Sequence, residues 1–419
     1  MAWTRAAALG FVALLLAGCV AGGPSAPQGA ASSAAAPRPT VVALLDTGIL
    51  PYHAAFAGNV TTLARLPGGA YTEVNLSTSG SLSDREAADD ATWSSLKTGQ
   101  LYHFAGTRLL AMSFLNASNP LSPGKRTLLD TTGHGTETAS LAAQADPEAI
   151  LVLLQIGGQV CAQPDCLIDP SIAEAVRWAA AQPWIDAISM SLAVPANAPD
   201  SSALHKEKEA FLEASREASR NGKLIFGAAG NEPEPTLAGY TNGPPWIVCV
   251  GGYEPANDGE SAYTAKGVDV LGNFTAQAAD YRTLNGTHWV SGTSYATPLV
   301  AGTVSRALGI VRAAGGAATP KALRDALNLS AVALDATGYD PLANPQDDPT
   351  LGHVTSPALP VVSPTQEGWG WVHAGLAPQI AQRVLRADAS VPPEKATIAT
   401  AQAAWQAQRE SYWSSALSG

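Results

Sequence analysis

Three short segments of the chain place a reactive side chain among small residues. Asp46 is followed by Thr-Gly, His134 lies in Gly-His-Gly-Thr at 133–136, and Ser294 lies in Gly-Thr-Ser-Tyr-Ala-Thr-Pro at 292–298. A hydroxyl, an imidazole and a carboxylate can act as nucleophile, general base and orienting group, so they predict nucleophilic catalysis. Each alone has a plainer explanation: a turn, a structural histidine or a helix cap.

A fourth segment supplies another group that such chemistry needs. Residues 223–226 read as a strand and run into Gly-Ala-Ala-Gly-Asn at 227–231. The side-chain amide of Asn231 can donate a hydrogen bond to an oxyanion, and the small residues before it leave space for a substrate side chain. Together the four segments indicate an acyl-transfer site more strongly than any one of them does.

Two other interpretations of these residues are weaker. Asp-Thr-Gly also occurs in aspartic peptidases, but those need two carboxylates that share a proton. The sequence contains no second Asp-Thr-Gly and no Asp-Ser-Gly. His53 follows Asp46 closely and is a minor alternative to His134, although it lacks flanking glycines.

The elements that must position these groups alternate between strands and helices. Short, almost wholly apolar runs predict strands buried on both faces, at 41–45, 150–156, 187–192, 223–229 and 247–251. Helical periodicity appears at 136–145, 170–181, 202–221 and 299–311. The alternation predicts an α/β fold, a three-layer, doubly wound and mostly parallel sheet with helices on both faces. Ligands bind at the carboxyl ends of such strands, where Asp46 lies.

Pro298 bears on the position of Ser294. A proline suits the first turn of a helix, where its missing N–H costs nothing, so we expect the helix to begin near Pro298. Ser294 would then lie close to a helix N-terminus, whose N–H groups and positive dipole can hold a developing oxyanion.

The order Asp46, His134, Ser294 resembles that of the subtilase family, and the resemblance covers roughly residues 40–380. Residues 292–298 are similar to the family's Gly-Thr-Ser-x-Ala-x-Pro nucleophile motif, and His134 and Asn231 lie in matching His-Gly-Thr and Ala-Gly-Asn contexts. Residues 368–372 resemble a late glycine-containing strand of the family. The resemblance implies a serine endopeptidase that works through an acyl-enzyme, with Asn231 in the oxyanion hole.

The resemblance also implies where a polypeptide substrate binds. Two segments should line the cleft beside an extended substrate. The first consists of Ser191, Leu192 and Ala193, and the second of Ala228, Ala229 and Gly230. No buried charge there selects Lys or Arg, so we expect a preference for apolar residues before the cleaved bond. The alternative is a peptidase-like surface binding module that lacks activity, but the presence of all four groups favours an enzyme.

Two positions depart from the family's pattern. Glu137 stands where a histidine commonly follows His-Gly-Thr, and Leu299 stands where one follows the motif proline. Neither is expected to perform the chemistry. The stretch from Asp46 to His134 is longer than in compact members, and we interpret 57–130, rich in Gly, Ser, Asn and Asp, as an insertion with a short hairpin.

The N-terminus predicts export and lipid anchoring. Residues 1–18 fit a signal peptide, because Arg5 precedes an apolar run too short to span a bilayer. Leu-Ala-Gly-Cys at 16–19 resembles a bacterial lipobox, so we expect Cys19 to be acylated and to become the new N-terminus; the alternative is an ordinary signal peptide with a nearby cysteine. Residues 19–39 read as a flexible tether, which leaves no room for a folding pro-domain. The predicted location is the extracytoplasmic face of the cell membrane.

The rest of the chain sets its domains and partners. We predict a peptidase domain at 40–390, with a Pro-rich loop at about 335–365, and a C-terminal helical tail at 391–419. The net charge of −11 and the lack of a basic stripe exclude a nucleic-acid partner. The chemistry requires no cofactor or metal, and a structural calcium ion, as some subtilases hold, is neither indicated nor excluded by any motif.

The chain contains four cysteines, of which Cys19 is assigned to lipidation. Cys161 and Cys166 are close enough in sequence to form a small disulfide loop in an oxidising compartment. A zinc site at this pair is a weaker alternative, because no second His or Cys pair lies nearby. Cys249 lies in an apolar run and is expected to be an inert core residue.

Overall fold

The computed structural model describes these residues: 37–58, 71–115, 126–157, 171–192, 202–231, 236–237, 239–254, 267–334 and 367–416. They lie within one compact unit, Pro37–Gly419. Several predictions concern residues outside these ranges: the signal peptide, Cys19, most of the tether, Cys161, Cys166, Ala193 and the Pro-rich loop at 335–365.

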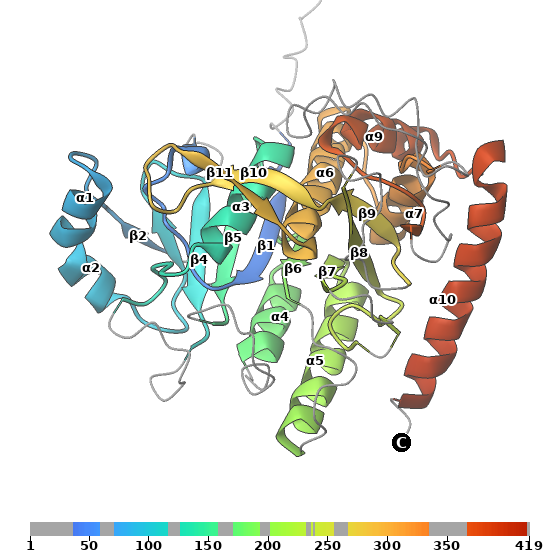
Figure 1. Cartoon of the computed structure of the whole chain (residues 1–419), viewed down its shortest axis with the longest axis horizontal. Helices are drawn as coiled ribbons and strands as arrows, with labels where there is room; N and C mark the ends of the chain where they lie inside the picture. The colour runs from blue at the N-terminus through green and yellow to red at the C-terminus, as the bar shows by residue number, and fades with distance from the viewer. Residues whose placement is uncertain are drawn as a thin grey trace, which may run out of the picture. The chain divides into compact units, whose positions relative to one another are not determined.

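The centre of the fold is a nine-stranded sheet with the order β2-β3-β4-β5-β1-β6-β7-β8-β9 (Figure 1). All neighbouring strands in it are parallel except β3 and β4. Its strands are β1 Val41–Asp46, β2 Thr72–Val74, β3 Tyr102–Phe104, β4 Leu109–Ser113, β5 Ile150–Gln155, β6 Ala187–Met190, β7 Leu224–Ala228, β8 Ile247–Tyr253 and β9 Val270–Asn273. A separate antiparallel hairpin consists of β10 Thr275–Ala279 and β11 Thr287–Ser291.

Helices cover both faces of the sheet. Successive side chains of a strand point to opposite faces, so a strand buried along its whole length needs helices packed on both. In β1, Val42 and Leu44 join one apolar cluster, whereas Val41 and Ala43 join another. The first cluster contains residues of α3 His134–Ala145, α6 Thr293–Ala313, α7 Pro320–Ser330 and α9 Ala377–Arg386. The second contains residues of α4 Ser171–Ala181, α5 Ser202–Arg220 and α10 Ala396–Ala416. The predicted α/β class with helices on both faces is confirmed.

The other helices of the described residues are short. They are α1 Leu82–Ala88, α2 Asp90–Ser95 and the 3-10 helices η1 Ala54–Phe56, η6 Ala374–Leu376 and η7 Pro393–Lys395. The long C-terminal helix α10 lies beside β9 at the end of the sheet (Figure 1).

The segment 57–130 holds more regular structure than the sequence suggested. The hairpin is present, formed by β3 and β4, but β4 also pairs in parallel with β5 and all five of its residues are buried. Strand β2 then extends the sheet beyond β3. Part of this segment is therefore an integral portion of the sheet. Its strands were missed because they are short and separated by polar, Gly-rich stretches.

The glycine-containing segment 368–372 does not form the expected strand. Trp371 forms only isolated bridges, to Leu271 and Val332. Gly368 and Gly370 have φ angles of +62° and +111°, in the left-handed region, which interrupts an extended backbone. The segment therefore contacts β9 as a loop.

Candidate active site

Asp46 is the last residue of β1, near the point where the helical connections change faces. Helix α3 precedes β5 and lies on one face, whereas α4 follows β5 and lies on the other. Ligand sites in doubly wound sheets form at such points. The buried carboxylate accepts hydrogen bonds from the backbone N–H of Thr47 and the hydroxyl of Thr138, both at 2.8 Å. Its orientation is fixed before any substrate arrives.

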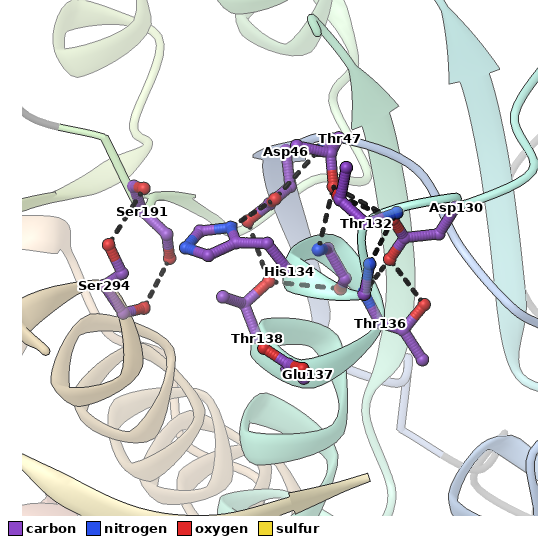
Figure 2. Close-up of polar contacts among 12 residues, drawn as sticks. Asp46, Thr47, Asp130, Thr132, His134, Thr136, Glu137, Thr138, Ser191 and Ser294 are labelled. Carbon is purple, nitrogen blue, oxygen red and sulfur yellow. Dashed lines mark hydrogen bonds and ion pairs between the residues drawn. The ribbon is translucent and has the colours of Figure 1, made fainter. Parts of the chain in front are cut away.

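His134 is the first residue of α3 and faces Asp46 (Figure 2). Its Nδ1 lies 2.7 Å from Oδ1 of Asp46, and its side chain is 13% exposed. Burial disfavours the charged imidazolium, but the charge and the hydrogen bond of Asp46 outweigh it, so the pKa of His134 is raised above its ordinary value. Because the carboxylate only accepts, Nδ1 carries the proton and Nε2 is left as the base.

Asp130, which the sequence interpretation missed, holds the first turn of α3. Its Oδ1 accepts from the N–H of Gly133 at 2.9 Å, and its Oδ2 accepts from the N–H and hydroxyl of Thr136 at 2.8 and 2.7 Å. These backbone groups lack intrahelical partners at a helix start, and a carboxylate also complements the helix dipole. An Asp shortly before a predicted helix was the available signal.

The glycines beside His134 permit close packing. Gly133 has a φ of +95°, and a Cβ atom there would lie 2.1 Å from the ring of Tyr281. A Cβ atom at Gly135 would lie 2.2 Å from the carbonyl oxygen of Gly48. A side chain at Gly133 would have to displace the Tyr281 ring, and one at Gly135 would have to displace the backbone at Gly48.

Helix α6 begins earlier than Pro298 suggested. It starts at Thr293, so Ser294 is its second residue and Pro298 lies inside the helix. A proline has no N–H to bond the carbonyl four residues earlier, which here belongs to Ser294. The hydroxyl of Ser191 takes this place and donates to Ser294 O at 2.7 Å. A side chain that follows β6 thus replaces the helical hydrogen bond.

The Ser294 hydroxyl is half-buried and donates to the carbonyl oxygen of Ser191 at 3.3 Å. Figure 2 shows the His134 imidazole between Asp46 and the pair formed by Ser191 and Ser294. Both His134 and Ser294 are described, and no hydrogen bond joins them in this conformation. Rotation about the Cα–Cβ bond of Ser294 redirects its Oγ, and catalytic hydrogen bonds often tighten only when substrate is bound.

Asn231 lies beside the start of α6. Its Oδ1 accepts from the N–H and hydroxyl of Thr293 at 2.9 and 3.0 Å, which leaves Nδ2 as a donor on an exposed residue. Gly292, whose φ is +147°, lies beside this amide, and a Cβ atom there would lie 3.4 Å from Nδ2 in ordinary contact. The side-chain amide and the N-terminus of α6 are therefore neighbours.

The described members of the predicted substrate-lining set lie at the carboxyl ends of neighbouring strands. Ser191 and Leu192 follow β6, whereas Ala229 and Gly230 follow β7. Ala228 ends β7 and is buried, as is Ala229, and Gly230 donates its N–H to the Thr293 hydroxyl at 3.2 Å. Both segments thus reach the start of α6. The sixth predicted member, Ala193, lies outside the described ranges.

Glu137, noted as a departure from the family's pattern, is buried beside the site. Its carboxylate accepts from Nε2 of His288 at 2.9 Å and from the hydroxyl of Tyr295 at 2.8 Å. Tyr295 follows Ser294, and its ring centroid lies 5.5 Å from that of His134. Burial and the nearby Glu137 charge raise the pKa of Tyr295, which stays a neutral donor. The sequence interpretation assigned neither Glu137 nor Tyr295 a place in the site.

His53, the minor alternative to His134, does not join this group. Its Nδ1 accepts from the N–H of Ala55 at 3.1 Å, and its Nε2 bonds the carbonyl oxygen of Gly286 at 2.9 Å. Burial lowers the pKa of His53. Cys249 is fully buried in β8, and burial raises the pKa of its thiol to about 12, as expected for an inert core residue.

Among the described residues, no group of three or more His, Cys, Asp or Glu side chains is arranged to hold a metal ion. Within the same ranges, every helix falls short of the length or the apolar character that crossing a membrane demands.

Residues 38–357 match the subtilase family, Peptidase S8, so the chain belongs to that family of serine peptidases. No curated protein matches the chain. Among solved structures it is similar to the prenylagaramide maturation protease PagA, with 16% identity, 82% of this chain and 94% of that chain covered, and a TM-score of 0.46. It is also similar to a mutant of the protease domain of PatA, with 16% identity, coverage of 84% and 97%, and a TM-score of 0.48.

Proposed function

We propose that this subtilase is an endopeptidase that cleaves polypeptides with Ser294 as nucleophile, His134 as general base and Asp46 as the orienting carboxylate. One observation carries the proposal: the buried Asp46 carboxylate lies 2.7 Å from Nδ1 of His134, and the opposite side of the imidazole faces Ser294 at the start of α6. This arrangement supplies the three roles that serine peptidase chemistry requires.

The reaction follows from the protonation states. Nε2 of neutral His134 accepts the hydroxyl proton of Ser294 while Oγ attacks the peptide carbonyl carbon, and Asp46 stabilises the imidazolium that forms. His134 then gives the proton to the leaving amine, and the C–N bond breaks. Water attacks the resulting acyl-enzyme with His134 again as base, which frees the carboxylic acid and restores Ser294.

The negative oxygen of the tetrahedral intermediate needs donors held in advance. We assign these to Nδ2 of Asn231 and the backbone N–H of Ser294, because Thr293 occupies the Asn231 amide oxygen. A donor that is fixed before reaction costs no reorganisation, and the loss of one raises the barrier by about 3 kcal/mol.

Incubation with an unfolded protein substrate tests the activity. Mass spectrometry of the products should show internal cuts that are absent when the substrate is incubated with Ser294→Ala. A mixture of synthetic peptides should show small or apolar residues before the cut, because the lining segment carries Ala228 and Ala229 and no charge. Trimming from chain ends alone contradicts endopeptidase activity, and a profile dominated by Lys and Arg contradicts the apolar preference. No cleavage of any substrate favours a peptidase-like binding module.

We also propose that acyl chains on Cys19 anchor the exported chain at the extracytoplasmic membrane face. The support is the lipobox-like 16–19 after an apolar signal and the tether that follows it. Fractionation of cells that express the full chain tests this. The wild type should partition with membranes and Cys19→Ala should be released, whereas equal partitioning of both contradicts lipidation.

A further inference from the structure

The last helix, α10, places a charged side chain in the protein interior. The guanidinium of Arg409 is fully buried, and its Nη1 lies 3.0 and 2.9 Å from the two carboxylate oxygens of Asp269. Burial alone would raise the pKa of Asp269, but Arg409 and Arg324 outweigh it and keep the carboxyl ionised, with a lowered pKa. Helix α10 lies outside the residues 38–357 that match the subtilase family.

The other donors of Arg409 hold the loop that precedes β8. Nε donates to the carbonyl oxygen of Gly243 at 2.7 Å, and Nη2 contacts the carbonyl oxygens of Asn242, Pro244 and Ile247 at 3.1, 2.6 and 2.9 Å. A planar guanidinium presents donors in several directions at fixed angles, which the single ammonium of lysine does not. Arg409 therefore holds the loop 239–246 at three of its carbonyl oxygens, and Arg324 holds a fourth, that of Pro245, at 2.6 Å.

Asn242 connects this loop to the proposed cleft. Its side chain is buried, and Nδ2 donates to the carbonyl oxygens of Ala228 and Ala229 at 2.9 and 3.0 Å. The chain continues from Ala229 through Gly230 to Asn231. A continuous series of hydrogen bonds thus runs from α10 to the turn 228–231 that carries the proposed oxyanion donor.

We propose that Arg409 is a positioning residue of the peptidase, which fixes the loop 239–246 and, through Asn242, the turn 228–231. The inference rests on the proposed function, because it assigns α10 a part in the same site. The helix is then a component of the catalytic unit and not an appended tail.

Two variants interrupt the series at different points, and a third serves as the control. Arg409→Lys keeps a positive charge beside Asp269 but loses the fork of donors. Asn242→Ala removes both side-chain hydrogen bonds to the turn and leaves the backbone carbonyl that Arg409 binds. Gln406→Ala, on the same helix, removes a 2.6 Å hydrogen bond to Asp269 and none to the loop.

The readout is kcat per active site titrated with a fluorophosphonate, measured well below each variant's melting temperature. Arg409→Lys and Asn242→Ala should each lower kcat by roughly tenfold, because a displaced donor no longer meets the oxyanion. The double variant should lose little more than the stronger single one, since both act through one path. Gln406→Ala should stay within about twofold of the wild type.

Hydrogen exchange of the peptide 224–231 gives a second readout that needs no activity. Exchange should accelerate in Arg409→Lys and Asn242→Ala and not in Gln406→Ala. Wild-type kcat and exchange in both of the first two variants overturn the inference, and so does an equal loss in Gln406→Ala, which reduces α10 to a source of stability. If the wild type neither labels nor cleaves, the proposed function has failed, and exchange alone then decides the inference.

Discussion

The helices α3 and α6 both begin at the candidate active site, but carboxylates hold the start of α3 whereas neutral groups hold the start of α6. Carboxylates surround the start of α3: Asp46 bonds the imidazole of His134, Asp130 caps the first turn, and Glu137 lies within that turn. The first turn of α6 contains no acidic residue, and neutral groups of Ser191 and Asn231 hold it.

This difference matches the charges that the proposed reaction creates. Positive charge develops on the imidazole at the start of α3, where buried carboxylates stabilise it. Negative charge develops on the substrate oxygen near the start of α6, where N–H donors and the helix dipole face it. Substitutions that remove charge from one side or a donor from the other should therefore have separable effects.

The largest expected effect comes from removing the carboxylate that faces the imidazole. Asp46→Asn should lower kcat by about 10⁴ with little change in KM, because the amide favours the wrong imidazole tautomer. Steady-state kinetics on a peptide substrate measure this. Asp325→Asn, on the exposed surface of α7, is the matched control and should behave as wild type. A loss below about tenfold in Asp46→Asn would show that the buried carboxylate does not orient the base.

The next largest effect should come from Asn231, at the start of α6. Asn231→Ala should lower kcat by about 10² to 10³ and leave KM nearly unchanged, because the amide acts on the tetrahedral oxygen and not on the ground state. A matched control is Asn221→Ala, whose side chain bonds Ala180 O away from the site. A rise in KM with unchanged kcat in Asn231→Ala contradicts the oxyanion assignment.

Asp130→Asn should act on stability before chemistry. Its NH2 group would face either the backbone N–H of Gly133 or that of Thr136, because the two bond different oxygens of Asp130, so unfolding in urea should show a loss of about 3 kcal/mol. Asp90→Asn, at an exposed ion pair with Arg126, should change the free energy of unfolding by less than about 1 kcal/mol. Equal stability of the two variants would contradict the capping role.

The smallest effect is a change in the pH profile. The charge of Glu137 adds to that of Asp46 in raising the pKa of His134, and the neutral imidazole is the active form. Glu137→Gln should therefore lower this pKa and move the acid limb of kcat/KM to lower pH. Tyr295→Phe keeps the charge, so its acid limb should stay closer to that of the wild type. A shift of the Glu137→Gln profile to higher pH contradicts this reading.

Local sequence patterns predicted the central strands and the segments that carry His134 and Ser294. Continuous apolar runs identified the central strands β1, β5, β6, β7 and β8, and the small residues around His134 and Ser294 marked the junctions where they lie. The predicted start of α6 was wrong. The hydrogen bond that Pro298 cannot donate to Ser294 O comes instead from Ser191, which lies 103 residues before Ser294. Strand β4 was missed because Ser113 interrupts its apolar run and the surrounding segment is rich in Gly, Ser, Asn and Asp.

Charge pairs between residues far apart in the chain could not be predicted either, because local sequence patterns do not show which distant residues meet. Nothing near Arg409 indicates that its guanidinium pairs with Asp269, 140 residues away, so the C-terminal helix read as a tail. Glu137 was recognised as unusual, but its partners His288 and Tyr295 lie on β11 and α6. Such contacts depend on tertiary packing, which no local periodicity reports.

Covalent labelling of the purified chain with a fluorophosphonate tests the central claim most directly. Intact-mass analysis and peptide mapping should find one phosphonyl group, on Ser294. Ser294→Ala should take up none, and His134→Ala should react far more slowly than the wild type, because the base is gone. A label on another residue, or an equal labelling rate in His134→Ala, would contradict the proposal that Asp46, His134 and Ser294 act as one catalytic unit.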